Sequence, residues 1–343
     1  MNMDLIFTQE RHIGLVSLNR PQALNALSLS MIRALQQQLT LWQNDHTIHA
    51  VVIRAVEGKA FCAGGDVRWL YETGRAHDPE QMPFFWHEYR LNQYIHDYPK
   101  PYVAMMDGLT MGGGVGISMH GSHPVASERF IFAMPETSIG FFPDIGASHL
   151  LTRCPDHVGM YLGLTGNRVN AQDAYDLGLV KHVIRSDAFS DALHALIDAN
   201  LSSDAAAGVT TCLQSFAAPV LSSSLSEEQR GFIAHCFKKP DVESILAALN
   251  EENGEWHRDI LTNLNYKSPL SLKVTLKQLQ QAEHLTLADC LRVDSCLVQH
   301  FMRDHDFYEG VRALLVDKDK TPHWEPEGLA NVNEGMVSRY FEC

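Results

Sequence analysis

Two carboxylates, Glu136 and Asp144, stand eight positions apart in an otherwise apolar stretch, FAMPETSIGFFPDIGAS. Burying an unpaired charge is costly, so acids in such a stretch must be paired, hydrogen-bonded or used in chemistry. Two prolines and two glycines interrupt the stretch, which predicts a loop rather than one continuous helix. We therefore expect both acids to act on one bound substrate. The rest of the chain must supply a pocket and a place for developing negative charge.

Two glycine-rich loops, AGG at 63–65 and GGGVG at 112–116, each follow a strand-like apolar run. Glycine lets a main-chain N–H approach a ligand closely. Two such groups converging on one oxygen form an oxyanion hole, in which each donor contributes about 3–4 kcal/mol to transition-state stabilisation. Taken alone, the glycines of 112–116 favour the alternative that they permit tight packing or a turn. The carboxylate pair that follows them favours the oxyanion hole.

Other chemistries lack their sequence signals. The chain has no G-x-G-x-x-G or G-x-x-x-x-G-K-[ST] nucleotide loop, no G-x-S-x-G elbow and no H-E-x-x-H motif. We therefore expect neither a nucleotide cradle nor a serine hydrolase, and no metal site. Cys62 is interpreted as a small packed thiol, and Asp66 as a helix cap. Glu88 lies on an aromatic-rich helix, where the default expectation is a solvated face.

The apolar and capping patterns predict alternating strands and helices in the first half of the chain and helices thereafter. A helix is expected after the cap at Ser28, and another after Ser268-Pro269. These patterns predict an α/β protein, with a catalytic core over residues 1–185 and a mainly helical region over residues 186–343. The expected strands include residues 13–18, 50–55, 102–106 and 130–133, and a further helix spans residues 80–97.

Composition narrows the function classes. The chain has 343 residues and a formal net charge of −14, which argues against nucleic acid or an anionic membrane as a partner. It has no apolar run of membrane-spanning length and no N-terminal signal pattern. Its seven cysteines are scattered without C-x-x-C, which favours free thiols in a reducing compartment. We therefore expect a cytoplasmic protein.

The assembled motifs resemble the crotonase (enoyl-CoA hydratase/isomerase) superfamily, and most closely its 3-hydroxyisobutyryl-CoA hydrolase branch. The resemblance covers nearly the whole chain, and the PET-x-IG-x-FPD block is specific to the hydrolase branch. It implies a spiral of β-β-α repeats with a C-terminal helical region, and a homo-oligomer, trimeric or hexameric. The matching blocks are AFCAGGDVR at 60–68, KPYVAMMDGLTMGGGVGISMHG at 100–121, FAMPETSIGFFPDIG at 132–146, SPLSLKVTLKQL at 268–279 and HDFYEGVRALLVDKDKTPHW at 305–324.

The resemblance also assigns binding roles by motif position. The N–H groups of Gly65 and Gly113 would hold the thioester oxygen of an acyl-CoA substrate. Glu88 and Gly64 would contact the substrate. No separate cofactor is implied, because coenzyme A is part of the substrate.

By the same resemblance, Glu136 falls on the catalytic glutamate and Asp144 on its partner acid. Hydratases of the superfamily place a second glutamate where this chain has Gly116, so the acid pair has moved. This departure favours hydrolysis of a short 3-hydroxyacyl-CoA over hydration. Two alternatives remain: an enoyl-CoA hydratase or isomerase on the same fold, and a catalytically silent acyl-CoA-binding protein.

Overall fold

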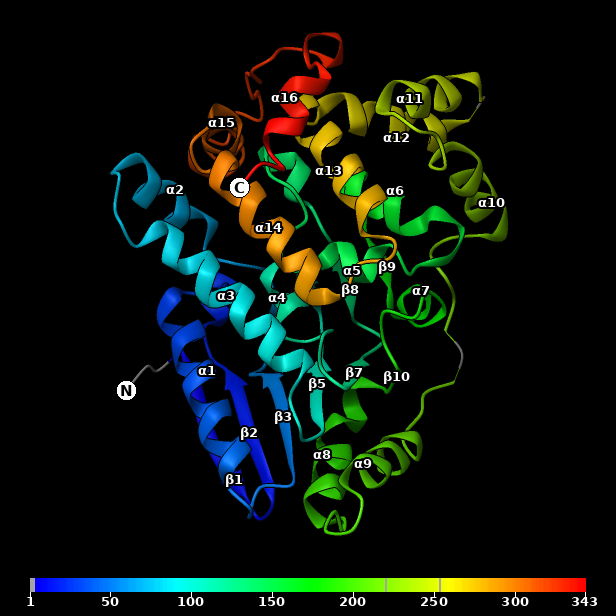
Figure 1. Ribbon diagram of the computed structural model, residues 1–343. Helices are drawn as coiled ribbons and strands as arrows, with labels where there is room; N and C mark the ends of the chain where they lie inside the picture. Colours follow the sequence, from blue (N-terminus) through cyan, green and yellow to red (C-terminus); the bar gives the residue numbers. More distant parts are fainter. Residues whose placement is uncertain (1–3, 220, 253) are drawn as a thin grey trace. The chain divides into compact units, whose positions relative to one another are not determined.

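The computed structural model describes residues 4–219, 221–252 and 254–343 (Figure 1). Within this part the chain forms two compact units, each assembled from three separate segments. The first unit comprises Met1–Gly65, His87–Phe132 and Val169–Ser224, and the second comprises Asp66–Trp86, Ala133–Arg168 and Leu225–Cys343.

A six-stranded sheet organises the first unit. Its strand order is β1-β2-β3-β5-β7-β10, in which β1 and β2 are antiparallel and the other pairs are parallel (Figure 1). Every residue of β2 and β5 is buried, as expected for apolar strands that are covered on both faces. The bounds are β1 Leu5–Glu10, β2 Ile13–Leu18, β3 Ala50–Ala55, β5 Tyr102–Met106, β7 His123–Ala126 and β10 His182–Val183.

Alternate residues of the sheet form the core of this unit with two helices, α8 (Phe189–Asp198) and α9 (Ala205–Gln214). Side chains two positions apart in a strand share one face of a sheet. The strands therefore present a continuous apolar surface to both helices. The core residues are Ile13, Leu15, Ala50, Val52, Val103, Met105 and Val125 from the strands, with Leu193, Leu196, Val209 and Leu213 from the helices.

A second, four-stranded sheet has the order β4-β6-β8-β9. Two of its strands lead directly into the glycine-rich loops. The bounds are β4 Ala60–Cys62, β6 Leu109–Met111, β8 Ile131–Ala133 and β9 Val169–Asn170. Apart from α5 and α6, the α-helices up to residue 176 are α1 Leu29–Asn44, α2 Val67–Arg75, α3 Gln81–His96, α4 Gly113–Gly116 and α7 Ala171–Asp176.

The second unit is mainly helical. Its α13 is buried along most of its length and packs against α5, α6 and α11. Ser268 caps α13 by accepting the N–H of Ser271 at 3.0 Å, with Pro269 in the first turn, as the sequence predicts. The bounds are α5 Ala147–Leu151, α6 Val158–Thr165, α10 Glu227–Cys236, α11 Val242–Glu251, α12 Glu255–Tyr266, α13 Pro269–Ala282, α14 Leu287–Phe301, α15 His305–Val311 and α16 Glu334–Arg339.

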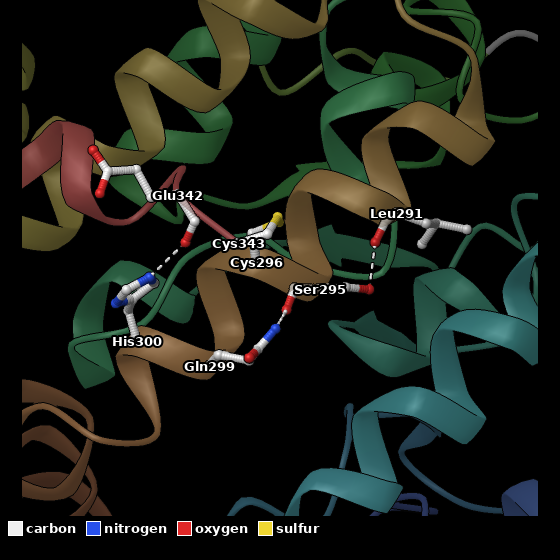
Figure 2. The surroundings of a disulfide bond; sticks show 7 residues. All are labelled: Leu291, Ser295, Cys296, Gln299, His300, Glu342 and Cys343. Atoms are coloured by element: carbon white, nitrogen blue, oxygen red, sulfur yellow. Dashed lines mark hydrogen bonds between the residues drawn. A yellow bond between two sulfur atoms is a disulfide. The ribbon is translucent and has the colours of Figure 1, made fainter.

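A disulfide joins Cys296 of α14 to Cys343 (Figure 2). The expectation that all seven cysteines are free thiols is therefore wrong for this pair. The two residues lie 47 positions apart, and no local motif marks them, so only the fold brings them together. Beside the bond, the ring of His300 donates a hydrogen bond to the carbonyl oxygen of Glu342 at 3.0 Å. The other five cysteines, Cys62, Cys154, Cys212, Cys236 and Cys290, are free.

Secondary structure changes character along the chain. The named strands all end by Val183, and the described residues beyond it form helices and connecting segments. The division into a core over residues 1–185 and a helical region over residues 186–343 stays a prediction, and the compact units follow a different, interleaved pattern. No helix in the described part of the chain has both the length and the apolar character needed to cross a membrane.

Candidate active site

In the first unit, the loop after β4 presents the main chain of Gly64 and Gly65. Gly64 has a φ of +114°, a conformation that side chains other than hydrogen rarely tolerate. Its carbonyl oxygen accepts the N–H of Leu27 at 2.8 Å, and Gly65 forms an isolated β-bridge with the same residue. These contacts fix the loop, so its remaining N–H groups point in set directions.

The loop after β6 brings Gly113 to the same place. Gly112, with a φ of +47°, turns the chain into α4. A Cβ added to Gly113 would lie 2.4 Å from Oε1 of Glu88 and 3.3 Å from the N of Gly65. Gly113 therefore packs directly against the Glu88 carboxylate and close to the amide of Gly65, and a side chain at position 113 would overlap Glu88.

Three glycines of 112–116 lie close to neighbouring residues, and those neighbours differ in kind. A Cβ on Gly114 would lie 2.3 Å from the carbonyl oxygen of Cys62, and one on Gly116 would lie 2.6 Å from the amide nitrogen of Asn92. These two glycines permit close packing of α4 on its neighbours. Gly113 is packed as closely, but its neighbours are the Glu88 carboxylate and the amide of Gly65, so the oxyanion interpretation stays a prediction for that residue.

Glu88 is buried, with 2% of its surface exposed, so the default expectation of a solvated face is wrong. It lies on α3 one turn before Asn92, which is also buried, and residues four apart share one face of a helix. Burial raises the pKa of Cys62 to about 12, and the nearby Glu88 charge adds to the shift, while the Gly64 backbone opposes it. The Cys62 thiol donates to the carbonyl oxygen of Asn25 at 3.1 Å, which agrees with its interpretation as a packed thiol.

In the second unit, Glu136 begins a short 3₁₀ helix, η2 (Glu136–Ile139), which ends at Gly140 in the left-handed conformation. Its side chain is buried, and Oε2 has no hydrogen-bond partner within the part of the chain that the structure describes. Burial raises the pKa of Glu136 well above its usual range, and the charge of Asp144 raises it further. A buried carboxyl with an unused oxygen and a perturbed pKa is typical of a reacting group.

Lys267, just before the cap of α13, supplies the opposing charge. Its ammonium donates to Oγ of Ser138 in η2 at 2.5 Å. Burial lowers the pKa of Lys267 to about 8, and the attraction of Glu136 partly offsets this. The lysine in turn lowers the pKa of Glu136, against the effects of burial and Asp144. The predictions from sequence did not include this lysine.

Asp144 lies on a tight turn, residues 144–147, that leads into α5 and is closed by the N–H of Ala147 donating to the carbonyl oxygen of Asp144 at 2.9 Å. Its side chain is 6% exposed. Ile145 has a φ of +56° and Gly146 a φ of +70°, so two consecutive residues are left-handed. A β-branched residue in that region is a genuine outlier that costs roughly 1–3 kcal/mol and persists only where neighbouring contacts enforce it.

Two buried side chains from α13 and α14 enforce this turn, and sequence reasoning missed both. The N–H of Gly146 donates to Oδ2 of Asp294 at 2.7 Å. The amide of Gln278 donates to Oδ1 of Asp294 at 2.8 Å and to the carbonyl oxygen of Pro143 at 3.0 Å. Complete burial raises the pKa of Asp294 well above its usual range, and the charge of Asp144 contributes to the rise.

One signal could have found Asp294. It stands in the middle of the buried stripe of α14, at the three- and four-residue spacing that otherwise carries apolar side chains. An acid at such a position must have buried polar partners. The stripe consists of Leu287, Cys290, Leu291, Asp294, Leu297, Val298 and Phe301.

The chain is similar to a known family and to curated relatives over nearly its whole length. A model of the enoyl-CoA hydratase/isomerase family matches residues 13–341. The mitochondrial 3-hydroxyisobutyryl-CoA hydrolase of Rattus norvegicus is 42% identical over 335 residues, which cover 96% of this chain and 86% of the relative. Its counterpart from Xenopus tropicalis is 41% identical over 346 residues, with 98% and 88% covered.

Among solved structures, a carnitinyl-CoA dehydratase from Mycobacterium thermoresistibile superposes with a TM-score of 0.93. It is 36% identical, and the match covers 100% of this chain and 97% of that one. This match confirms the predicted fold class. The expectation of a cytoplasmic protein is wrong by the same comparisons, because the relatives from rat and Xenopus tropicalis are mitochondrial.

Proposed function

Because this chain belongs to the enoyl-CoA hydratase/isomerase family, we propose that it hydrolyses a short 3-hydroxyacyl-CoA thioester. The substrate is 3-hydroxyisobutyryl-CoA, an intermediate of valine breakdown, and the products are 3-hydroxyisobutyrate and CoA. The relatives from rat and Xenopus tropicalis carry this activity in their names. The observation that carries the proposal is the buried Glu136, whose pKa is raised by burial and by the charge of Asp144.

The first step polarises the thioester. The carbonyl oxygen accepts hydrogen bonds from the N–H groups of Gly65 and Gly113 as it gains negative charge. Glu88 and Gly64 contact the substrate beside these amides. The closeness of Gly113 to the amide of Gly65 and to Glu88 supports this assignment. Main-chain donors that are fixed before the substrate arrives need no reorganisation in the transition state.

The second step breaks the carbon–sulfur bond. The Glu136 carboxylate either attacks the carbonyl carbon to form an anhydride, which water then opens, or removes a proton from a water that attacks directly. In both routes one water is consumed, CoA leaves as the thiol, and the acyl group leaves as the free acid. Asp144 binds the 3-hydroxyl of the substrate or helps to move the proton.

The reaction needs no separate cofactor in this proposal, because a thiolate is a good leaving group and coenzyme A enters with the substrate. The family resemblance further predicts a homo-oligomer, trimeric or hexameric, which remains a prediction. Analytical ultracentrifugation of the purified chain would test it.

Dehydration or hydration is the second candidate, because the matched solved structure is a carnitinyl-CoA dehydratase. By the resemblance, hydratases place a second glutamate at the position of Gly116. Here a Cβ at that position would lie 2.6 Å from the amide of Asn92, so the space beside α4 is already occupied. This packing favours hydrolysis, for which the second acid is Asp144.

A panel of acyl-CoA esters with a thiol-detecting dye tests the proposal. We expect stoichiometric release of CoA thiol, fastest from 3-hydroxyisobutyryl-CoA and next from 3-hydroxypropionyl-CoA. A hydratase would change the absorbance of an enoyl-CoA without releasing thiol. A protein that binds the esters and changes none of them would be the catalytically silent acyl-CoA-binding protein.

A further inference from the structure

The turn that carries Asp144 is bound on both sides of that residue. The carbonyl oxygen of Pro143, just before it, accepts from Gln278 at 3.0 Å, and the N–H of Gly146, two positions after it, donates to Asp294 at 2.7 Å. Gln278 and Asp294 are joined to each other at 2.8 Å. We call Gln278 and Asp294 the turn clamp.

The turn clamp has the burial that a fixed support requires. Asp294 is 0% exposed and Gln278 is 1% exposed. Oδ2 of Asp294 accepts a hydrogen bond from the N–H of Gly146, and Oδ1 accepts one from the amide of Gln278. Oε1 of Gln278 has no hydrogen-bond partner in the described part of the chain, but its NH2 group is used twice, and losing this arrangement would leave further buried groups without a hydrogen bond.

Both members come from helices whose starts are themselves fixed. Ser268 caps α13, and its hydroxyl donates to Oδ2 of Asp306 at 2.5 Å. Thr286 caps α14 in a capping box with Asp289. The turn clamp therefore transmits the position of two anchored helices to a strained turn.

We propose that Gln278 and Asp294 are positioning residues for Asp144, which hold the left-handed turn so that the Asp144 carboxylate meets the substrate in its reactive geometry. The inference rests on the proposed function, in which Asp144 contacts the acyl chain or moves the proton. The turn clamp does not touch the substrate. A misplacement of about 1 Å at a reacting group can cost 10²-fold in rate, so loss of the clamp should reduce kcat more than it reduces binding.

The test compares D294N, Q278M and D144N in the full chain, with hydrolysis of 3-hydroxyisobutyryl-CoA and of isobutyryl-CoA, which lacks the 3-hydroxyl. D294N keeps one oxygen for Gly146 but turns an NH2 group toward the NH2 group of Gln278. We expect kcat to fall about 10- to 100-fold with KM changed less than about threefold. The ratio of the kcat losses on the two substrates should match the ratio that D144N shows.

The double variant D294N/Q278E provides the rescue. It reverses the pair, so that the amide at 294 donates to the carboxylate at 278 and still accepts from Gly146. The number of buried carboxyl groups is unchanged. We expect part of the lost kcat to return, because two of the three contacts are restored, while the carboxylate at 278 turns an oxygen toward the carbonyl oxygen of Pro143 in place of the donor.

Matched controls separate positioning from general loss of packing. Asp173 is a buried carboxylate in a capping box with Asn170, and Gln81 is a buried amide that donates to the carbonyl oxygen of Leu70 at 2.9 Å. D173N and Q81M should lower the thermal midpoint while kcat stays within about twofold. Hydrogen exchange of the peptide that spans residues 141–147 should increase in D294N and Q278M and not in the controls.

The outcomes distinguish the two proposals. If the wild-type chain releases no thiol from any ester, the proposed function fails, and the positioning role fails with it. If the wild type is active and D144N is impaired, while D294N and Q278M keep wild-type kcat, the turn clamp is overturned and the proposed function stands. The turn clamp is also overturned if D294N changes the two substrates in a pattern unlike that of D144N. Should D294N fail to fold, Q278M alone decides by the same criteria.

Discussion

The two units carry different kinds of functional group. In the first unit, glycines bring main-chain amides beside Glu88, and backbone hydrogen bonds with an earlier segment, at Leu24 and Leu27, hold the first loop. In the second unit, ionisable side chains are buried together, and residues more than a hundred positions away hold them, at 267, 278 and 294. An amide donor carries no net charge and costs less to bury than an ionised carboxylate. A buried carboxylate needs compensating partners, so the buried acids of the second unit depend on residues far away in the sequence.

The largest expected effect on activity comes from substitution of the buried acid Glu136. Glu136→Gln keeps the shape of the side chain but removes the nucleophile or base, so kcat for thiol release should fall at least about 10³-fold. Circular dichroism should show an unchanged fold. The control is Glu128→Gln, which changes a half-buried glutamate that accepts the N–H of Ser186 in the first unit. Normal hydrolysis by Glu136→Gln would remove this residue from the mechanism.

Activity should also be sensitive to one methyl group added beside the proposed oxyanion amides. In Gly113→Ala the new Cβ would lie 2.4 Å from Oε1 of Glu88 and 3.3 Å from the N of Gly65, so Glu88 must shift and the amides assigned to the oxyanion are disturbed. We expect kcat/KM to fall about 10²-fold. Gly231→Ala is the matched control, because position 231 is helical and has nothing within 4 Å of its Cβ position. Equal activities of the two variants would refute the assignment of Gly113.

Much of the first unit could be predicted from sequence because its signals are local. The strands at 13–18, 50–55 and 102–106 have the expected bounds, since short apolar runs are read from neighbouring residues. The caps at Ser28 and Ser268 are also local, because the capping side chain and the amide it accepts lie three residues apart.

The support of the acid cluster could not be predicted in the same way. Lys267, Gln278 and Asp294 act through contacts that span 129 to 148 positions, for which one sequence offers no period or spacing. The burial of Glu88 was missed for a related reason. The aromatic residues around it gave no single apolar face, so the side that packs on α4 was not evident.

The charge of Lys267 gives a third, smaller test. Its removal in Lys267→Met should raise the pKa of Glu136 further, because the lysine is the positive group that opposes burial and the Asp144 charge. If the carboxylate is the reactive form, the acid limb of the kcat–pH profile should move to higher pH. At pH values on that limb, kcat should be lower than in the wild type.

Lys273→Met is the control for this shift. Lys273 is a half-buried lysine of α13 whose ammonium donates to the carbonyl oxygen of Val332 at 2.9 Å. The kcat–pH profile of Lys273→Met should match that of the wild type. In the wild type, Lys267 itself loses its proton near pH 8, so the difference between Lys267→Met and the wild type should shrink above that pH. A wild-type profile for Lys267→Met at all pH values would contradict the assigned charge coupling.

The smallest expected effect is on stability, and its sign is opposite to the effect on activity. The folded pKa of Glu136 is raised above its unfolded value, so the unfolded state loses this proton first as pH rises. The group therefore destabilises the fold above about pH 4.5 and has no effect below it. Glu136→Gln should raise the free energy of unfolding by about 1–3 kcal/mol at pH 7. Urea titrations at pH 7 and pH 4 should show the gain only at pH 7, and a loss at pH 7 would contradict the account.

Hydrolysis of 3-hydroxyisobutyryl-CoA in water enriched in oxygen-18, followed by mass spectrometry, tests the cleavage of the thioester most directly. We predict free 3-hydroxyisobutyrate with the label in its carboxylate, and one equivalent of CoA thiol. An unsaturated acyl-CoA, or label in the hydroxyl group of an intact CoA ester, would contradict the account.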